Sequence, residues 1–419
     1  MISTDNISIQ FGSKPLFEDI NVTFSDNNKY GLIGANGSGK STFMKILSGE
    51  IEPSTGSVKY DLNQRIAVLK QDHFAFESVK ICDCVMMGHK KLWKIKTERD
   101  RIYDLEKMSE EEALKVSDLE IEFSDLDGYM ADSNASELLL SLGIEIELHH
   151  QEMNILAPGM KLRVLLAQAL FGDPEILLLD EPTNNLDLDT IKWLENILQN
   201  SNSTMIIISH DRHFLNSVCT HIADIDYGEI RLYPGNYDNF MIASTQARQR
   251  LLDENKKKKD KINELKTFVK RFSANASKAK QATSRANQID KIKMEDIKKS
   301  SRVYPFIRFE QERKLLNIIL EVKNLCKNYD KLNILENFNL TLNAEDRLAI
   351  LGPNGIGKTT LINCLINEIK NNGGLIKWSE NANIAYFSQN INDNTNISLL
   401  DWMSQWARND DSLQIIRGL

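Results

Sequence analysis

Short apolar runs that alternate with helical segments set the pattern of the first 240 residues. Positions 176–179 and 205–208 each hold four consecutive apolar residues, and positions 66–69 hold another such run. Runs this short, bounded by turn residues, are typical of strands that are buried on both faces of a parallel sheet. Helical spacing lies between them, as in residues 161–170. The pattern predicts an α/β fold.

Residues 241–305 carry a different pattern. Apolar residues keep helical spacing over two stretches, first at Leu251, Ile262, Leu265, Phe268 and Phe272, and then at Ala279, Ala282, Ala286, Ile289 and Ile292. The polar segment 273–278 between them weakens a helix. We therefore predict an antiparallel two-helix hairpin with its tip near residues 273–280.

The positive charge of the chain is concentrated in this same segment. The whole chain has a formal net charge of −8, but residues 241–305 hold 18 Lys/Arg against 7 Asp/Glu, a net +11, which leaves −19 for the remainder. A solvated helix normally mixes both signs, whereas every charged residue between positions 265 and 289 is basic. This bias favours a polyanionic partner. The basic residues of this stretch are Lys266, Lys270, Arg271, Lys278, Lys280 and Arg285.

A glycine-rich turn lies between an apolar strand and a helix. Residues 34–41 read G-A-N-G-S-G-K-S and fit the phosphate-loop pattern G-x-x-x-x-G-K-[ST]. Glycines let consecutive N–H groups point at a phosphate on a helix N-terminus. We expect Lys40 to reach the terminal phosphates and the Ser41 hydroxyl to ligate Mg²⁺. The predicted nucleotide-binding residues are Gly34, Ala35, Asn36, Gly37, Ser38, Gly39, Lys40, Ser41 and Thr42.

The motif recurs near the other end of the chain. Residues 352–359 read G-P-N-G-I-G-K-T, after an apolar segment at 348–351 that predicts a strand and before a predicted helix. The recurrence favours nucleoside triphosphate binding over a chance glycine-rich turn. The second predicted set is Gly352, Pro353, Asn354, Gly355, Ile356, Gly357, Lys358, Thr359 and Thr360.

Polar residues close the apolar runs. Asp180 and Glu181 follow the run at 176–179, so we expect Asp180 to hold Mg²⁺ and Glu181 to act as general base on the attacking water. His210 closes the next buried strand, at the sheet edge where doubly wound folds bind ligands. Gln71 ends the run that begins at position 66, and its amide is placed for a metal or a water. Gln389 ends the corresponding segment 384–389 of the second copy.

An aromatic residue ends a predicted strand before each loop, Phe11 in the first copy and Tyr329 in the second. Each could stack on a nucleobase. The alternative, that each is a core residue, has about equal weight on the residue alone.

Length and composition limit the class of protein. At 419 residues, with 42% hydrophobic and 26% charged residues, the chain is expected to form two or three globular domains. It contains no apolar run of membrane-crossing length and no secretory segment at its start. The five cysteines form no paired C-x-x-C set, which argues against zinc and favours reduced thiols. We expect a cytoplasmic protein.

Taken in order, these motifs resemble the ATP-binding-cassette superfamily. The resemblance includes a signature-like turn at 156–159 and the loop at 186–187. Tandem cassettes, a basic helical linker and the run D-E-P-T-N-N-L-D at 180–187 resemble the ABC-F family within it. The stretches 158–168 and 274–278 are most similar to the YbiT-like branch of that family. The resemblance covers essentially the whole chain.

The resemblance implies tandem P-loop ATP-binding domains joined by a helical-hairpin linker. Residues 1–240 would form the first domain with a helical arm near 82–135, residues 241–305 the linker, and residues 306–419 the N-terminal part of the second domain. It further implies an ATP hydrolase that uses Mg²⁺, binds the ribosome near the E site and controls translation, with the linker reaching ribosomal RNA and P-site tRNA. No DNA partner is expected.

The resemblance also assigns roles to residues. Lys40, Gln71, Glu181 and His210 would be catalytic. The metal would be held by Ser41, Gln71, Asp180, Thr359 and Gln389. Ala157 and Gly159 of the signature-like turn would face the ATP that is bound by the other domain. The six basic residues between positions 265 and 289 would contact RNA.

Two departures from the family pattern lead to further expectations. The signature normally opens Leu-Ser-Gly-Gly, but here it reads Leu-Ala-Pro-Gly, so Ala157 lacks a hydroxyl that would meet the γ-phosphate. A hydrogen bond to a charged group contributes roughly 1.5–3 kcal/mol, and we expect weaker closure or slower turnover. The second copy contains no counterpart of 156–159, Asp180, Glu181 or His210. We therefore expect a chain truncated within the second domain, with low ATPase activity of its own.

Three other functions remain open. A soluble ATP-binding subunit of a membrane transporter would share the cassettes but leaves the basic hairpin unexplained. A DNA-repair or chromosome ATPase usually carries zinc modules or a much longer coiled coil inserted within one cassette, and this sequence shows neither. A ribosome-protecting antibiotic-resistance factor ranks below general translation control, because the predicted tip is short and polar.

Overall fold

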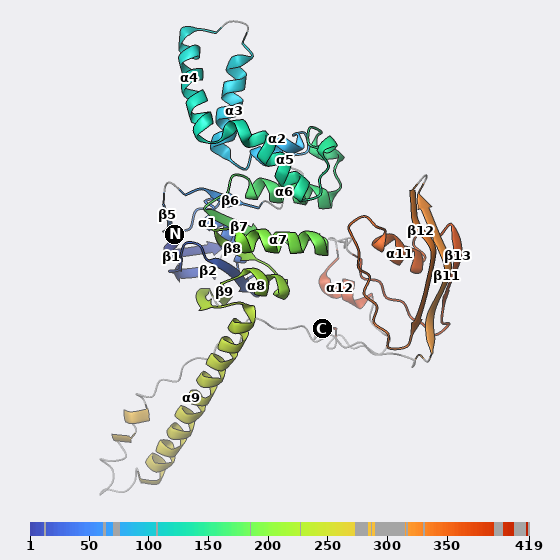
Figure 1. Ribbon diagram of the computed structural model, residues 1–419. Helices are drawn as coiled ribbons and strands as arrows, with labels where there is room; N and C mark the ends of the chain where they lie inside the picture. The colour runs from blue at the N-terminus through green and yellow to red at the C-terminus, as the bar shows by residue number, and fades with distance from the viewer. Residues whose placement is uncertain are drawn as a thin grey trace. The chain divides into compact units, whose positions relative to one another are not determined.

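The protein forms two compact units, Met1–Arg302 and Val303–Leu419, and each contains one glycine-rich motif. Figure 1 shows the computed structural model, coloured along the chain. It describes all residues except 12–13, 62–63, 70–75, 106–107, 185, 227, 273–283, 286, 290–314, 316, 330–331, 389–396, 406–415 and 418–419.

A six-stranded sheet forms the centre of the first unit, in the order β10-β9-β4-β8-β7-β6. Pairing is parallel from β9 to β6, and β10 lies antiparallel on one edge. All five residues of β8 and the first four of β7 are buried, as expected for strands covered on both faces. The predicted α/β fold is confirmed. The strands are β4 (Lys29–Gly34), β6 (Ile66–Val68), β7 (Ile176–Asp180), β8 (Thr204–Ile208), β9 (His221–Asp226) and β10 (Glu229–Pro234).

The register of this sheet aligns the ends of its strands. Leu32 of β4 and Asp180 of β7 both pair with Ile208 of β8. Neighbouring strands lie about 4.8 Å apart, so β4, which continues to Gly34, and β7 and β8 all end at one edge of the sheet. The chain continues there into the phosphate loop, into Glu181 and into His210. Three segments distant in sequence therefore meet at one place.

A second, antiparallel sheet packs against the helix that follows the phosphate loop. Phe17 of β2 and Phe43 of α1 lie edge to face, with ring centroids 5.9 Å apart, inside one buried cluster that also contains Ile206 and Ile208. The β1–β2 hairpin is thereby fixed against α1. The elements are β1 (Ile2–Phe11), β2 (Lys14–Ile20), β3 (Thr23–Phe24), β5 (Thr55–Tyr60) and α1 (Lys40–Leu47).

Helices account for most of residues 81–170. α2 packs on α5 and α6, and α3 pairs with α4. α6 begins at Pro158, three residues before the expected start at 161, because proline is well suited to the first helical position, where its missing N–H costs nothing. The bounds are α2 (Ile81–Met86), α3 (Lys90–Tyr103), α4 (Glu110–Asp125), α5 (Ala131–Ser141) and α6 (Pro158–Leu170). Helices α7 (Leu188–Asn200) and α8 (Arg212–Val218) complete the α/β core.

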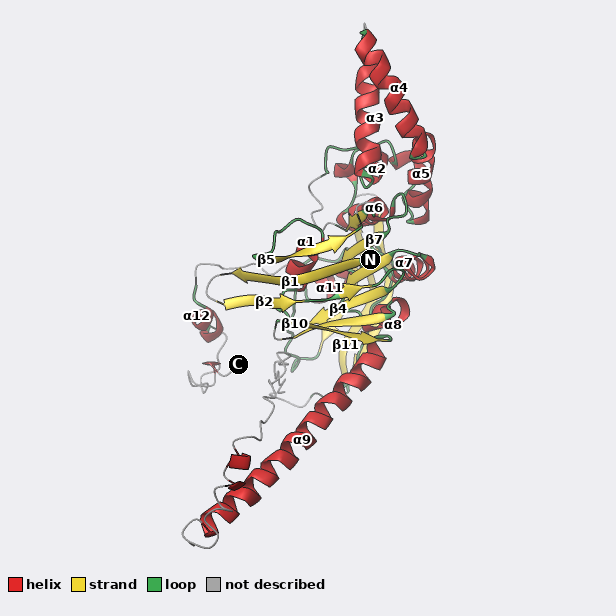
Figure 2. Ribbon diagram, turned by 90° about the vertical axis from the view of Figure 1, so that its left-hand side faces the viewer, coloured by secondary structure: helices red, strands yellow, loops and turns green. Residues whose placement is uncertain are grey.

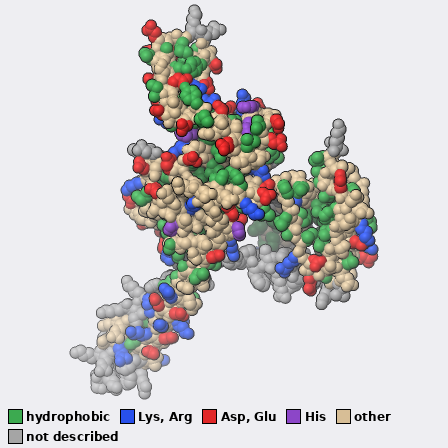
Figure 3. All heavy atoms as spheres, in the orientation of Figure 1, with side chains coloured by type: hydrophobic (Ala, Val, Ile, Leu, Met, Phe, Trp, Pro, Cys, Tyr) green, Lys and Arg blue, Asp and Glu red, His purple; other side chains and the backbone are tan. Residues whose placement is uncertain are grey.

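The first arm of the expected hairpin is a single helix, α9 (Tyr237–Phe272), of 36 residues (Figure 2). Its base is anchored by Phe240, which is buried against Tyr233 and Tyr237. Lys/Arg and Asp/Glu are interspersed over its visible surface (Figure 3). The expected tip and most of the second arm lie outside the described residues. None of the helices described is long and apolar enough to cross a membrane.

The second unit repeats the antiparallel sheet and the loop. β11 (Ile318–Tyr329) pairs with β12 (Leu332–Asn343) and with β13 (Gly373–Trp378), and α11 (Lys358–Leu365) follows the loop. A short helix, α12 (Leu399–Ser404), lies further on. The strands expected at 348–351 and 384–389 are corrected: residues 348–351 and 384–388 form no strand, and position 389 is outside the described residues. In the first unit, the corresponding strands pair with β7, β8 and β9, whose counterparts are missing from the described part of this unit.

Candidate nucleotide-binding site

The first phosphate loop connects the end of β4 to the start of α1. The Lys40 ammonium donates hydrogen bonds to the backbone carbonyls of Gly34 at 3.0 Å and Ala35 at 3.1 Å. Gly39 caps α1 with a φ of 94°, and a Cβ at this position would lie 2.5 Å from the ring of Phe17. Only glycine satisfies both the left-handed backbone and the close approach. The loop therefore curls around the ammonium group of its own lysine.

This loop has the donors expected of a phosphate cradle. The Ser38 hydroxyl is buried and makes no hydrogen bond to any described residue. A Cβ at Gly37 would meet nothing within 4 Å, so that side of the loop is open. Ser41 and Thr42 lie in the first turn of α1, whose N-terminal N–H groups carry partial positive charge. An unpaired buried hydroxyl costs about 1–3 kcal/mol, and a bound phosphate oxygen would remove that cost. The residues fit a phosphate.

Glu181 and His210 face each other at the sheet edge. Glu181 Oε1 lies 3.4 Å from His210 Nε2, and the His210 backbone N–H donates to Oε2 at 3.3 Å. Glu181 has a φ of 50°, a left-handed conformation that costs of order 1–3 kcal/mol in a non-glycine residue. Its N–H donates to the carbonyl of Ile208 at 2.9 Å. The strained backbone is thus held by the neighbouring strand, and it aims the carboxylate at the site.

The electrostatic surroundings of Glu181 suit a proton acceptor. Burial raises the pKa of this carboxyl above its ordinary value of 4.5, while His210 lowers it, Asp180 raises it and Lys40 lowers it. The ammonium of the phosphate loop therefore acts on this carboxylate. A carboxylate with a raised pKa accepts a proton from water more readily. The structure brings Lys40, Asp180, Glu181 and His210 together.

A partly buried ion pair, between Arg163 and Asp187, was missed by the sequence reasoning. Arg163 of α6 donates to Asp187 Oδ2 at 2.6 Å and to the carbonyl of Leu142 at 3.1 Å. Asp187 caps α7 by accepting from the Thr190 N–H at 2.9 Å. Burial raises the pKa of Asp187, but hydrogen bonds from Thr190 and Arg163 outweigh it, so the pKa is below its usual value. An aspartate before a helix is a capping signal, whereas the sequence spacing around Arg163 does not predict that it pairs with Asp187.

The signature-like turn forms the N-terminus of α6. Ala157 is the N-cap residue, with φ −62° and ψ 150°, and it supplies no side-chain cap. Gly159 lies in the first turn. The role of Ala157 and Gly159 toward the ATP of the other domain stays a prediction.

The second loop repeats the geometry of the first. Gly357 caps α11 with a φ of 106°, and Lys358 Nζ donates to the carbonyls of Gly352 at 2.7 Å and Pro353 at 2.8 Å. A Cβ at Gly357 would lie 2.3 Å from Ile334 Cγ2, a residue of β12. The loop itself contains Asn354, Gly355 and Ile356, and Thr359 and Thr360 lie in the first turn of α11.

The two aromatic residues occupy equivalent exposed positions. Phe11 pairs with Lys14, and Tyr329 pairs with Leu332, so each aromatic ends a strand at a hairpin tip. Phe11 is 60% exposed and Tyr329 44%. These exposures rule out the core interpretation. Each hairpin also contacts its own glycine-rich loop, through Phe17 in one case and Ile334 in the other.

The remaining predicted site residues are two glutamines and the basic residues of the linker. Gln71, Gln389, Lys278 and Lys280 lie outside the described residues. Lys266 and Lys270 are exposed on α9, Arg271 belongs to the same helix, and Arg285 is exposed in a short helical segment.

Comparison with known proteins places the chain in a family. A family model described as "ABC transporter" matches residues 17–184 and 335–416, and a second model of the same description matches residues 223–309. The chain is 58% identical to "Probable ATP-binding protein YbiT" of Escherichia coli O157:H7 over 421 residues, which cover 100% of this chain and 79% of that protein.

Two further relatives agree. "Uncharacterized ABC transporter ATP-binding protein YkpA" of Bacillus subtilis is 47% identical, with 100% of this chain and 78% of that protein covered. "Probable ATP-binding protein YheS" of Haemophilus influenzae is 31% identical, with 93% and 60% covered. Both carry an ATP-binding name, in agreement with the two phosphate loops. The chain therefore belongs to the ABC-F family of ATP-binding-cassette P-loop ATPases.

Proposed function

We propose that this protein binds the ribosome when it holds ATP, leaves it after hydrolysis, and so controls translation in the cytoplasm. Membership of the ABC-F family and the basic helix α9 support the proposal. In this proposal the nucleotide site is the switch, and the linker that begins with α9 contacts ribosomal RNA and P-site tRNA. Residues 1–240, 241–305 and 306–419 serve as first ATP-binding domain, linker and second-domain segment.

At the nucleotide site, the chain's own residues hold and orient the reactants. Lys40 and the N–H groups of the loop hold the terminal phosphates. Glu181 accepts the proton of the attacking water, because its backbone and the His210 N–H fix its carboxylate. His210, whose side chain is 66% exposed, senses the γ-phosphate from the open side. Mg²⁺ bound through Ser41 and Asp180 would neutralise charge on the phosphate oxygens.

The observation that carries the ribosome proposal is the distribution of charge along α9. Near its middle, Lys256 and Lys257 lie within one helical turn of Asp253 and Asp260, so their charges are largely compensated. Beyond Leu265, every charged residue of the helix is basic, and the Lys266 and Lys270 side chains are exposed. Lysines without compensating acids are available to release counterions from a phosphate backbone, which drives binding to RNA.

Co-sedimentation with purified ribosomes tests the proposal. The chain carries Glu181→Gln, so that bound ATP persists, and is spun with ribosomes with ATP, with ADP and without nucleotide, at two salt concentrations. We expect pelleting in ATP that weakens as salt rises. Changing Lys278, Lys280 and Arg285 to Ala should reduce it further. Pelleting that is equal in all nucleotide states, or absent in all of them, contradicts the proposal.

We also infer that this chain by itself turns over ATP slowly. In the ABC-F pattern, each ATP lies between the phosphate loop of one domain and the signature of the other. The sequence contains one signature-like turn, and Ala157 in that turn offers no hydroxyl. Steady-state hydrolysis at saturating ATP measures the rate. Turnover near the enzyme median of about 10 s⁻¹ contradicts this inference.

A further inference from the structure

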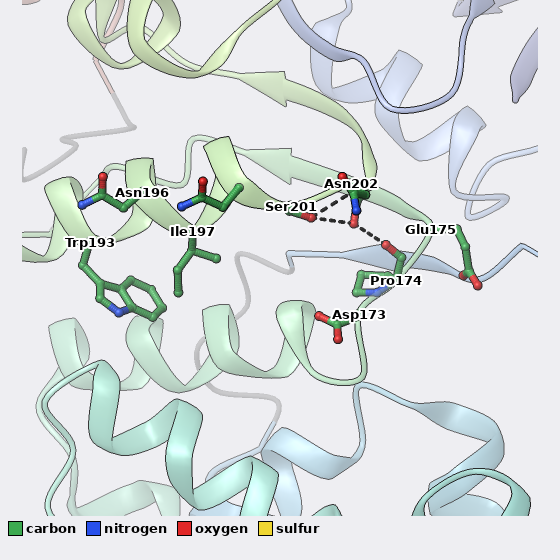
Figure 4. Close-up of a pocket in the computed structure, with 10 residues that line it drawn as sticks. Asp173, Pro174, Glu175, Trp193, Asn196, Ile197, Ser201 and Asn202 are labelled. Atoms are coloured by element: carbon green, nitrogen blue, oxygen red, sulfur yellow. Dashed lines mark hydrogen bonds between the residues drawn. The ribbon is translucent and has the colours of Figure 1, made fainter.

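A cleft lies at the end of the first unit's sheet opposite the nucleotide site. Its volume is about 640 Å³, within the range of about 300–1,000 Å³ of small-ligand sites. Its walls are the 173–175 segment that enters β7, the last two turns of α7, and the 201–203 turn that enters β8 (Figure 4). β7 and β8 begin here and end at Asp180 and Ile208. The cleft shares no residue with the phosphate loop or with Glu181.

Hydrogen bonds between its own walls keep this cleft, the α7 cleft, in shape. The Ser203 hydroxyl donates to the carbonyl of Pro174, and the Ser201 hydroxyl donates to the hydroxyl oxygen of Ser203 at 2.9 Å. Dashed lines mark these hydrogen bonds in Figure 4. The Thr204 N–H donates to the carbonyl of Glu175 at 2.8 Å. The two walls are thus joined before any ligand arrives. A preformed cleft spends little free energy on ordering when it binds.

The charge in the α7 cleft is negative. Asp173 and Glu175 are exposed and are the charged residues among those that line it. α7 ends at Asn200, and the C-terminus of a helix carries partial negative charge. This helix end already holds one cation, since Lys29, only 9% exposed, donates from Nζ to the carbonyl of Gln199 at 2.9 Å. The surroundings therefore favour a positively charged ligand.

Arg65 is the basic residue that acts on these two carboxylates, and it does not occupy the cleft. Its guanidinium donates to the carbonyls of Phe171 and Gly172. The bond from Arg65 to Glu175 Oε2, at 2.9 Å, comes from its backbone N–H. Burial lowers the pKa of Arg65, while Glu175 and Asp173 raise it. Because the guanidinium is bonded to the backbone, the carboxylates keep their capacity for a second cation.

An apolar surface lies along the α7 wall of the cleft. Trp193 and Ile197 are one turn apart on α7 and point to the same side, toward the helix that ends at the loop of Asp173 (Figure 4). Both side chains are partly buried against the main core. The aromatic ring and the aliphatic group suit the hydrocarbon stem of a cationic ligand.

We propose that the α7 cleft binds a guanidinium group on an aliphatic stem, as in an arginine side chain or a small alkylguanidine. The stem lies along Trp193 and Ile197, and the guanidinium bonds to Asp173 and Glu175. A guanidinium suits the cleft better than an ammonium, because its planar fork matches carboxylates. Binding here requires neither ATP nor the ribosome.

Isothermal titration of the 419-residue chain tests the proposal. The first probe is acetyl-Gly-Arg-Gly-amide, compared with the same peptide carrying norleucine, and agmatine is the free small guanidine. We expect saturable binding of the arginine peptide or of agmatine, unaffected by ATP, and none of the norleucine peptide. Tighter binding of the peptide identifies a protein arginine as the natural ligand, and tighter binding of agmatine identifies a metabolite. If neither guanidine binds, the proposal is wrong.

Variants with little expected effect on folding locate the binding. Asn tolerates the left-handed conformation of position 173, where φ is 49°, and Gln at 175 still accepts the Arg65 N–H. The double variant Asp173→Asn/Glu175→Gln should weaken binding about tenfold, and Trp193→Phe about threefold. Glu111→Gln/Asp118→Asn, an equal loss of two charges from exposed residues of α4, is the control. Equal affinity in the double variant and in the control would overturn the assignment.

Discussion

The two glycine-rich loops have the same conformation in different settings. In each, a left-handed glycine caps the following helix and the motif lysine donates to the first two carbonyls of the loop. The first loop leaves β4, which pairs with β8 and β9. The second leaves residues 348–351, which form no strand and pair with none of the described strands. Loop shape is local, whereas the strand depends on its neighbours.

This difference separates two kinds of sequence information. Glycine positions and a lysine specify the loop through steric limits and short hydrogen bonds within eight residues. An apolar run becomes a central strand only when flanking strands accept its backbone hydrogen bonds. The apolar residues of the second copy illustrate the point, because Leu351 is 72% exposed where its counterpart Ile33 is 7% exposed.

The largest expected effect is on the rate of ATP hydrolysis, which we assign to the site at the first loop. Glu181→Gln keeps the size and the acceptor for the His210 N–H but removes the proton acceptor, so we expect hydrolysis to fall about 10²–10⁴-fold with ATP affinity retained. Lys358→Ala leaves Glu181 in place and should lower the rate much less. Single-turnover hydrolysis and nucleotide titration measure both. Unchanged turnover in Glu181→Gln would remove this residue from the catalytic role.

The next effect tests the two settings directly. Ile33→Ala leaves a cavity in a packed sheet and should lower the free energy of unfolding of the first unit by about 2–5 kcal/mol. Leu351→Ala removes a side chain that is already mostly in water, and should change the second unit by no more than about 0.5 kcal/mol. Hydrogen exchange of α1 and α11 in rising urea reports each unit separately. Similar losses at both positions would contradict the comparison.

A smaller effect comes from the capping glycines. Gly39→Ala places a Cβ against the fully buried Phe17 ring, and the strained cap should cost about 1–3 kcal/mol. Gly357→Ala meets the side-chain methyl of the partly exposed Ile334, which can move, so its cost should be lower. The same exchange measurement compares them. A larger loss at Gly357 would show that the settings of the loops are misjudged.

A change of about 1 kcal/mol is expected at the signature-like turn. Ala157→Ser adds a hydroxyl at the N-cap of α6, and a serine cap stabilises a helix by about this amount. The same hydroxyl should tighten ATP binding at the second loop, because this turn would face the ATP that is bound by the other domain. Ala157→Gly is the matched control, because glycine also suits an N-cap but has no hydroxyl. An ATP affinity of the second loop, measured by nucleotide titration, that is the same in the Ser and Gly variants would refute the hydroxyl argument.

The smallest expected change is a shift of the pH profile. Glu181 must be ionised to accept a proton, and burial raises its pKa above 4.5, so hydrolysis should fall as pH drops through that raised value. His210 lowers this pKa, so His210→Gln should move the acid limb to higher pH. In the parent and in the His210→Gln variant, the folded state binds the Glu181 proton more tightly than the unfolded state does. The Glu181 carboxyl therefore contributes less to stability as pH rises from its ordinary pKa of 4.5 through the raised pKa. An acid limb that stays in place contradicts the coupling.

Sequence reasoning predicted the parts of the molecule that depend on local pattern. The runs at 176–179 and 205–208 became buried parallel strands, and their shared edge assembled Asp180, Glu181 and His210 because parallel strands end together. The first helix of the linker also follows from apolar spacing. These features need only periodicity and capping rules.

The remaining features depend on tertiary contacts that the sequence does not announce. The Arg163–Asp187 pair joins residues on two helices. The α7 cleft forms from three segments joined by serine hydroxyls. Residues 348–351 form no strand, because none of the described strands lies beside them to accept their backbone hydrogen bonds. In each case the decisive partner is distant in the chain.

Ribosome binding by two matched α9 variants tests the central claim most directly. Both variants carry Glu181→Gln. The first variant replaces Lys266 and Lys270 with Ala; these lysines lie in the part of α9 after Leu265, where every charged residue is basic. The second replaces Lys256 and Lys257 with Ala; these lysines lie between Asp253 and Asp260. We predict that the first pair loses ATP-dependent pelleting with ribosomes and has a shallower dependence on salt, whereas the second pair binds like its parent. Equal binding by both variants would contradict a role for the distal part of α9 in contacting RNA.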